Sequence, residues 1–565
     1  IRIGGLNVEL EEMSSQVVGA QLGQEAISTS LLAGLIGLII VCVFMCCVYY
    51  LPGFASSLAL IIYTELILVL LNAFDITLTL PGIAGIILGI GMAVDANVII
   101  FARVKEELTE GKSVHAALNA GFHKAMSAII DGNVTTLIAA AVLWLRGSGT
   151  IRGFAQTLAL GIVVSMFTAL VITRLIIYSF YGIGIRNKKL YGRLLKKRKT
   201  IDFLGKRKVF FALSIVMCLS GFVFMGINHA RGIGAMNYSL DFVGGTSTTV
   251  TFDRAYTLDE VDSEMVPDLE EITGDANIQV QTVRDSNQVI FKTQTLDLNE
   301  REALNQYMEE NYGVAQEDIE MTNISSTVSS EMRTDAVIAV VIATVCMLLY
   351  IWFRFKDVRF ATSAVVALVH DVLVVLAFYV IARVSVGSTF IACMLTIVGY
   401  SINATIVIFD RIREELKTKP KDMSLKDLVN DCIMRTLTRS IYTNLTTFIM
   451  VVCLYVLGVS SIKEFAAPLM VGIACGTYTS VCITGALWYV MKTKLGAGAK
   501  ELAAAEATAA KQIGVAADAG RGGNAAAGEN STGNAANASV SGKNAGQQGG
   551  GKASGGKKKK RKRRQ

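Results

Sequence analysis

The sequence predicts an α-helical polytopic membrane protein, a pseudo-two-fold duplicated bundle of about eleven transmembrane helices with one α+β domain outside the membrane. The 565 residues are 52% hydrophobic and only 18% charged, and apolar stretches near the ~20 residues of a membrane helix recur. One stretch is duplicated: residues 91–108 and 399–416 align without a gap at an offset of 308, with eight of eighteen pairs identical.

The repeat extends beyond these segments. Asn133–Thr136 matches Asn444–Thr447, and Ile151–Ala155 matches Ile462–Ala466, both at an offset of 311 residues. The second half therefore contains one helix, an outside domain and five helices, whereas the first half shows only five helices. We expect one more helix and an outside domain upstream in the reading frame.

A helical bundle satisfies the backbone of such apolar segments internally. The predicted spans are 28–50, 54–73, 80–103, 125–146, 154–180, 208–228, 333–353, 359–382, 388–410, 439–458 and 466–491. The predicted domains are the end of a truncated outside domain (1–27), a five-helix half (28–185), a basic linker (186–207), a leading helix (208–229), an α+β domain (230–330), a second five-helix half (331–492) and a disordered tail (493–565).

Charge asymmetry predicts the orientation. Residues 186–208 carry eleven Lys or Arg and one acid, whereas 241–330 carry nineteen acids and four bases. Because positive loops stay inside, the linker and the C-terminal tail are expected in the cytoplasm and 230–330 outside.

The outside segment predicts a small α+β domain. Its expected elements are a strand at 245–252, a helix from the capping box of Thr257 and Glu260, strands at 277–283 and 287–293 around a turn at 285–287, a helix from Asp297 with Glu300, and a strand at 317–323. The order βαββαβ is ferredoxin-like. The segment lacks a nucleophile constellation, a metal cluster and a phosphate loop, so we expect neither an enzyme site nor a cofactor.

The tail after about Leu495 is rich in Ala, Gly and Asn and ends in KKKKRKRRQ. Such a composition cannot bury a core, so we expect disorder. The basic end could hold anionic lipid or ribosomal RNA through phosphate contacts. A solvated tail without a fixed partner is the alternative.

Titratable groups inside the apolar spans are the candidate proton relay. Asp95 lies near the middle of its span with Asn97 two residues on, and burying such a carboxylate costs ~2.5–3.5 kcal/mol on insertion scales. It can load and release protons; the alternative is a packing role among Asn, Thr and Ser neighbours. Asp131, Asp371 beside His370, and Arg439 are the other candidates, although Arg439 could also snorkel to headgroups.

Two further features accompany these residues. Gly91 and the glycines before it recur at near-helical spacing, which lets neighbouring helices approach or slide. The acidic side chains at the span exits are interpreted as parts of a solvated amphipathic helix; they are Glu106, Glu107, Glu414 and Glu415.

These motifs resemble the SecD and SecF proteins of bacterial protein export, as an N-terminally incomplete SecDF-type fusion of the resistance-nodulation-division superfamily. Leu78 to Asn97 is similar to the SecD membrane signature. The segment Asp241, Phe242, Val243, Gly244, Gly245 and Thr246 is similar to the SecF motif after its first helix, and His370–Asp371 and Arg439–Thr447 also match SecF. The remaining matched membrane-motif residues are Asn403, Thr405, Asp410, Arg411, Thr443, Thr446 and Thr447.

The resemblance implies an accessory to the Sec channel complex and its membrane subunits in the bacterial cell membrane. It would use the proton motive force, or a sodium gradient, to promote translocation and outward release of unfolded preproteins, with membrane lipids around it. Asp95 and Arg439 would lie on the proton path. One departure concerns Ala404, which stands where the family usually has an intramembrane Asp.

Two other functions remain open from the residues. A drug or lipid exporter of the same superfamily would call for a broad aromatic pocket, and the aromatic residues of 230–330 are scattered. A passive scaffold of the translocon would leave Asp95 without a role.

Overall fold

The computed structural model describes residues 12–17, 20–147, 149–192, 201–275, 278–283, 286–417 and 423–494. Within them, eleven helices are long and apolar enough to cross a membrane, which confirms the predicted polytopic helical class. The predicted tail from residue 495 on, including its basic end, lies outside the described residues.

The first half contains the helices α1 (Ala20–Tyr49), α2 (Leu51–Ala73), α3 (Leu80–Thr109), α4 (Val114–Arg146), α5 (Gly149–Phe167) and α6 (Thr173–Gly182). The second half contains α7 (Arg207–Ala230), α12 (Ser326–Phe355), α13 (Val358–Ala382), α14 (Ser388–Lys417), α15 (Leu425–Leu457), α16 (Ser460–Tyr478) and α17 (Gly485–Lys494). The π-helical segments η1 (Thr168–Ile172) and η4 (Thr479–Thr484) join α5 to α6 and α16 to α17.

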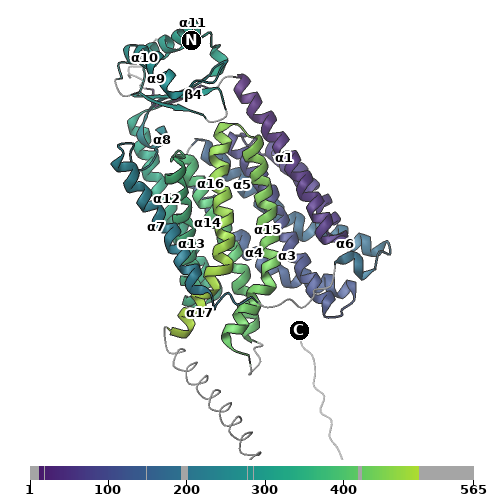
Figure 1. Cartoon of the computed structure of the whole chain (residues 1–565). Helices are drawn as coiled ribbons and strands as arrows, with labels where there is room; N and C mark the ends of the chain where they lie inside the picture. The colour runs from purple at the N-terminus through teal and green to yellow at the C-terminus, as the bar shows by residue number, and fades with distance from the viewer. Residues whose placement is uncertain are drawn as a thin grey trace, which may run out of the picture. The chain divides into compact units, whose positions relative to one another are not determined.

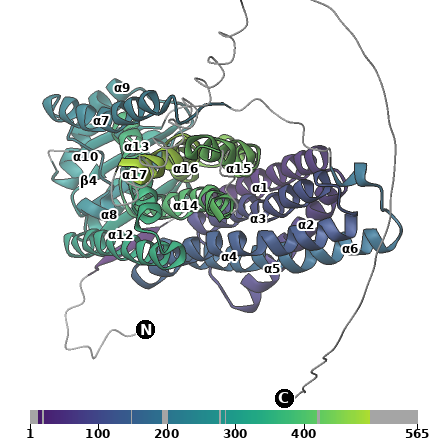
Figure 2. The same cartoon turned by 90° about the horizontal axis from the view of Figure 1, so that it is seen from below.

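The two halves contact each other around α3 and α14. Figure 2 shows α2, α5 and α6 on one side of the bundle and α7, α12 and α13 on the other. Helix α15 of the second half packs on α3, and α4 of the first half packs on α14. The helices α3 and α14 are consequently the most buried of the candidate spans.

Several helices begin earlier than the hydropathy predicted. α4 begins at Val114 rather than 125, and α15 begins at Leu425 rather than 439, each capped by a serine (Ser113 and Ser424). Hydropathy marks only the apolar part of a helix, whereas capping and packing of a polar first turn set its true start.

The α+β domain has the predicted element order, and Figure 1 shows α9, α10, α11 and β4 together at one end of the helix bundle. It contains α8 (Leu240–Val243), β2 (Gly245–Thr251), α9 (Leu258–Glu264), α10 (Val266–Thr273), β3 (Gln279–Thr282), β4 (Gln288–Thr293), α11 (Leu298–Tyr312) and β5 (Ile319–Ile324). Both predicted capping boxes are present, at Thr257 and at Asp297. Asp285 of the predicted turn lies outside the described residues.

The sheet order is β1-β5-β2-β4-β3, and every pairing is antiparallel. The four strands β5-β2-β4-β3 have the order of a ferredoxin-like sheet, and a core that includes Val250, Leu269, Phe291 and Leu304 packs beneath it. The edge strand β1 (Ser14–Val17) comes from before α1 and pairs with β5. The sequence did not predict this pairing, which ties the start of the first half to the domain of the second.

Candidate functional site

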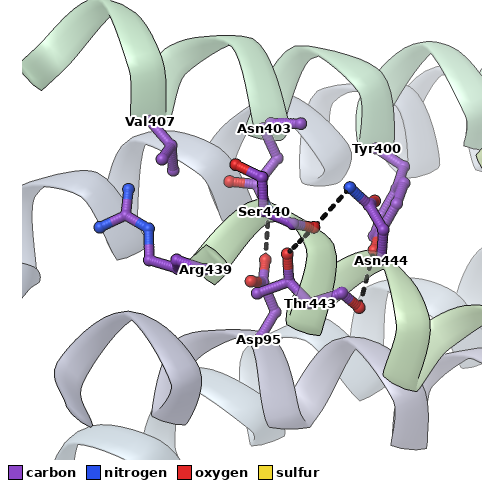
Figure 3. Close-up of a pocket in the computed structure, with 9 residues that line it drawn as sticks. Asp95, Tyr400, Asn403, Val407, Arg439, Ser440, Thr443 and Asn444 are labelled. Carbon is purple, nitrogen blue, oxygen red and sulfur yellow. Dashed lines mark hydrogen bonds between the residues drawn. The ribbon is translucent and has the colours of Figure 1, made fainter. Parts of the chain in front are cut away.

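A buried hydrogen bond joins the two copies of the repeat near the middle of their helices. Asn403 Nδ2 on α14 donates to Asp95 Oδ2 on α3 at 2.6 Å, as Figure 3 shows. The two residues are 308 positions apart, so they occupy equivalent places in the repeat. The duplicated segments therefore face each other, with a carboxylate on one side and an amide on the other.

A small cavity surrounds this bond. Its lining residues are Asp95, Tyr400, Asn403, Ala404, Val407, Arg439, Ser440, Thr443 and Asn444. The space open to a water-sized molecule is ≈ 10 Å³, about what one water needs. Figure 3 shows Arg439 and Val407 on one side of Asp95, and Tyr400 and Asn444 on the other.

Buried polar atoms around this cavity lack partners. Arg439 Nε, Ser440 Oγ and Asn403 Oδ1 have no hydrogen-bond partner among the described residues. Arg439 is only 7% exposed, and no carboxylate of the described residues lies within ion-pair distance of it. Leaving a buried polar atom unpaired costs about 1–3 kcal/mol of stability. Such unpaired atoms are typical of a site that binds a proton or a water molecule.

Hydrogen bonds of a tyrosine and two close contacts between helices fix the positions of the helices around the cavity. Tyr400 Oη donates to the Thr443 carbonyl oxygen at 3.3 Å and to Thr447 Oγ1 at 3.1 Å. A β-carbon at Gly91 would lie 2.9 Å from the Cα of Thr447, and one at Gly399 would lie 3.1 Å from the Cα of Thr136. The same contact is therefore made twice, once by each half.

Asp131 lies apart from this cavity. Its carboxylate accepts hydrogen bonds from Arg354 Nε at 2.6 Å and from Tyr350 Oη at 3.0 Å. Asp410 lies 3.9 Å from the same guanidinium. The sequence analysis did not identify Arg354, because only the packing of α12 on α4 brings it to Asp131.

The exits of α3 and α14 form a reciprocal ion network. Arg103 bonds Glu106 at 3.0 Å and Glu414 at 3.1 Å, and Arg411 reaches Glu414 at 3.2 Å and Glu106 at 3.5 Å. Glu107 is 2% exposed and pairs with two lysines.

The predicted solvated amphipathic surface is wrong for Glu107, which is buried and pairs with lysines of its own half. Glu106 and Glu414 are partly exposed and pair across the two exits, whereas Glu415 pairs with Arg411 and Arg435 of its own half.

The other predicted residues of α3, α14 and α15 are buried around the interface. Asn97 Nδ2 donates to the Ala93 carbonyl oxygen at 3.5 Å, and its Oδ1 has no partner among the described residues. Thr405 and Thr446 are buried. Asp371 is also buried, but it faces Ser401 on α14 instead of the cavity.

The motif from Asp241 to Thr246 connects the α+β domain to α14. Asp241 Oδ2 accepts a hydrogen bond from the first backbone N–H of α14, Ser388 N, at 2.9 Å, and another from Ser388 Oγ. Gly244 and Gly245 have φ of 82° and 116°, which favours glycine. Thr246 Oγ1 donates to Asn323 Oδ1 and accepts from Leu296 N, which fixes β2 inside the domain.

A duplicated helix bundle with titratable groups buried between its halves defines a class of membrane protein that includes ion-coupled transporters. Within this class, the family model for the protein export membrane protein SecD/SecF, C-terminal, matches residues 4–182 and 304–494. The chain belongs to the SecD/SecF family, as the sequence motifs predicted.

Known relatives are similar over most of the chain. The protein translocase subunit SecDF of Bacillus subtilis is 35% identical over 87% of this chain and 68% of its own length. The crystal structure of SecDF from Thermus thermophilus, described as a translocon-associated membrane protein, matches with a TM-score of 0.79 at 33% identity. That match covers 86% of this chain and 66% of the other, so this chain spans about two thirds of these relatives.

A more distant structure shares the fold alone. The hedgehog release protein Disp of a water bear matches with a TM-score of 0.54 at 12% identity, over 83% of this chain. The duplicated bundle is therefore common to proteins of different function.

Proposed function

We propose that this chain is an accessory subunit of the Sec protein translocase that uses the proton motive force to promote preprotein translocation and outward release. Its similarity to proteins named translocase subunit SecDF supports the partners, a Sec channel complex and unfolded preproteins. The observation that supports proton coupling is the buried Asp95–Asn403 bond beside Arg439, a cation without an ion pair among the described residues. This is a motor rather than an enzyme.

Protonation of Asp95 would change the contact between the halves. The ionised carboxylate accepts the Asn403 N–H strongly, whereas a protonated carboxyl accepts it weakly and gains an O–H of its own. Moving one proton through the membrane field yields ~2.3 kcal/mol per 100 mV. That energy is comparable to a few hydrogen bonds, enough to shift α14 against α3.

The shift can reach the α+β domain through α14. Asn403 lies on the same continuous helix as Ser388, whose N–H is held by Asp241. We place the domain outside the cell and the ion network of Arg103 and Arg411 at the cytoplasmic face, because the loops on the network side are basic. The domain would then grip or release an emerging preprotein.

The test is Asp95→Asn in the protein. We expect loss of the proton-dependent part of preprotein release from membrane vesicles, with normal expression. Glu65→Gln is the matched control, since Glu65 is a carboxylate in α2 that is exposed on the outer surface of the bundle. Normal release by Asp95→Asn under an imposed proton gradient would refute the motor and favour a scaffold. Release driven by a sodium gradient alone would identify sodium as the coupling ion.

A further inference from the structure

A second buried polar cluster lies in the second half, outside the cavity at Asp95. Asp371 is 0% exposed. Its carboxylate accepts hydrogen bonds from Ser401 Oγ on α14, from Thr479 Oγ1 at 2.5 Å and from Cys475 Sγ at 3.2 Å, and His370 Nδ1 lies 3.1 Å away. Three side-chain donors therefore converge on this carboxylate.

The open position in the cluster is a ring nitrogen. His370 Nδ1 faces Asp371 Oδ1 and also lies 3.1 Å from Thr479 Oγ1; in the tautomer in which Nδ1 donates to the carboxylate, Nε2 carries a lone pair. Nε2 has no hydrogen-bond partner among the described residues, although the side chain is only 7% exposed. Nε2 is therefore the ring position that is free to take a proton, and the adjacent Asp371 carboxylate would balance the charge of the protonated ring.

The first half shows that the fold itself does not require this cluster. At the repeat offset of 308, His370 and Asp371 correspond to Ile62 and Tyr63. The ring of Tyr63 is buried beside Gly89, where a β-carbon would lie 2.6 Å from Tyr63 Oη. Each half has one π-helical segment, η1 in the first and η4 in the second. Equivalent backbone therefore surrounds an aromatic ring in the first half and the His370–Asp371 pair in the second.

We propose that His370 and Asp371 form a second proton-binding site, with His370 Nε2 as the atom that takes the proton and Asp371 as its counter-charge. Binding makes one N–H bond and converts an imidazole–carboxylate pair into an imidazolium–carboxylate pair. The other titratable groups that face it are Cys475 and Tyr478 of α16 and Cys218 of α7. Among the described residues, no Lys or Arg forms an ion pair with Asp371.

The site acts on the same helix as Asp95. Ser401, which donates to Asp371, and Asn403, which donates to Asp95, are two residues apart on α14. Two residues rotate an α-helix by about 200°, so the two carboxylates hold opposite sides of α14. This role in the cycle rests on the proposed proton-driven function, whereas proton binding by His370 does not.

The decisive experiment is nuclear magnetic resonance of the full 565-residue chain in lipid nanodiscs with ¹⁵N-labelled histidine. The chain has four histidines, and His115, His123 and His229 are exposed internal references. We expect a His370 ring that carries hydrogen on both nitrogens at low pH and loses the Nε2 proton as the pH rises, and we expect this protonated form to be absent from Asp371→Asn. If His370→Gln does not fold, substitution of the three exposed histidines assigns the remaining signal.

Two results would overturn the proposal. One is a His370 ring whose nitrogen shifts stay constant from about pH 4.5 to 9; the other is one transition metal per purified chain that disappears in Cys475→Ser. In vesicles, we expect His370→Gln to change the pH dependence of preprotein release, while His229→Gln keeps the wild-type profile. Constant shifts with an inactive Asp95→Asn would refute this site alone, whereas a titrating His370 with a fully active Asp95→Asn would refute the motor alone.

Discussion

Gly91 is the residue at which α3 and α15 meet backbone to backbone. A β-carbon there would lie 2.9 Å from the Cα of Thr447 and 3.3 Å from Met450 Cγ, so Gly91→Ala must push the two helices apart. Overpacking of this kind costs about 1–3 kcal/mol. We expect a lower thermal midpoint for the purified protein and at least a several-fold loss of proton-dependent preprotein release.

Gly226→Ala is the matched control, because a β-carbon at Gly226 in α7 would meet no atom of the described chain within 4 Å. Alanine is favoured over glycine inside a helix by about 1 kcal/mol, so this variant should keep or raise the midpoint. Equal effects of the two substitutions would show that packing at Gly91 has no special role.

The sequence identified single residues where a polar group interrupts an apolar span. Asp95 and Arg439 stand out in this way, and both line the cavity. The partner of Asp95 was not predicted, because the family resemblance points to a second carboxylate at position 404, which is Ala404 in this chain, whereas the amide of Asn403 makes the bond. The repeat offset contains this information, since facing copies of a two-fold repeat pair equivalent positions.

Helix α14 connects the α+β domain to the cavity at Asp95, and its first N–H donates a hydrogen bond to Asp241. A carboxylate at a helix start satisfies free N–H groups and the helix dipole. Asp241→Ala should therefore loosen α14 at a cost of about 0.5–2 kcal/mol. We expect reduced proton-dependent release in vesicles, while Asp241→Asn, which keeps an acceptor oxygen, should retain most of it.

Asp297→Ala is the matched control. Asp297 caps α11 inside the α+β domain, where its side chain accepts a hydrogen bond from the Glu300 N–H at 2.8 Å. The substitution removes the same kind of cap without touching a membrane helix. If Asp297→Ala and Asp241→Ala reduced release equally at equal expression, the link through α14 would be wrong.

Elements that depend on neighbouring residues could be predicted from the sequence, whereas the pairing of strands distant in sequence could not. Both capping boxes were read directly from the sequence, because their donors and acceptors lie three residues apart. The pairing of Ser14–Val17 with β5 joins residues about three hundred positions apart. Four residues without strong hydropathic alternation do not specify such a partner.

The whole molecule must change the contact between its halves if the proposed cycle is correct. The pair Thr136 and Gly399 joins α4 of the first half to α14 of the second, and a β-carbon at Gly399 would lie 3.4 Å from Thr136 Cβ. This is close to the usual separation of about 3.5–4.5 Å in a disulfide. Cysteines at both positions, in a chain whose ten native cysteines are replaced by serine, should cross-link on oxidation.

We expect the oxidised Thr136→Cys/Gly399→Cys protein to lose proton-dependent preprotein release and to regain it after reduction, because a covalent bond prevents α14 from moving against α4. The control is Thr79→Cys/Gly153→Cys, a pair within the first half whose β-carbons would lie 3.5 Å apart. Its disulfide should leave release unchanged, since it crosses no boundary between the halves. Full release by the oxidised Thr136→Cys/Gly399→Cys protein, with cross-linking verified by mass spectrometry, would mean that protons are coupled to export without relative motion at this contact.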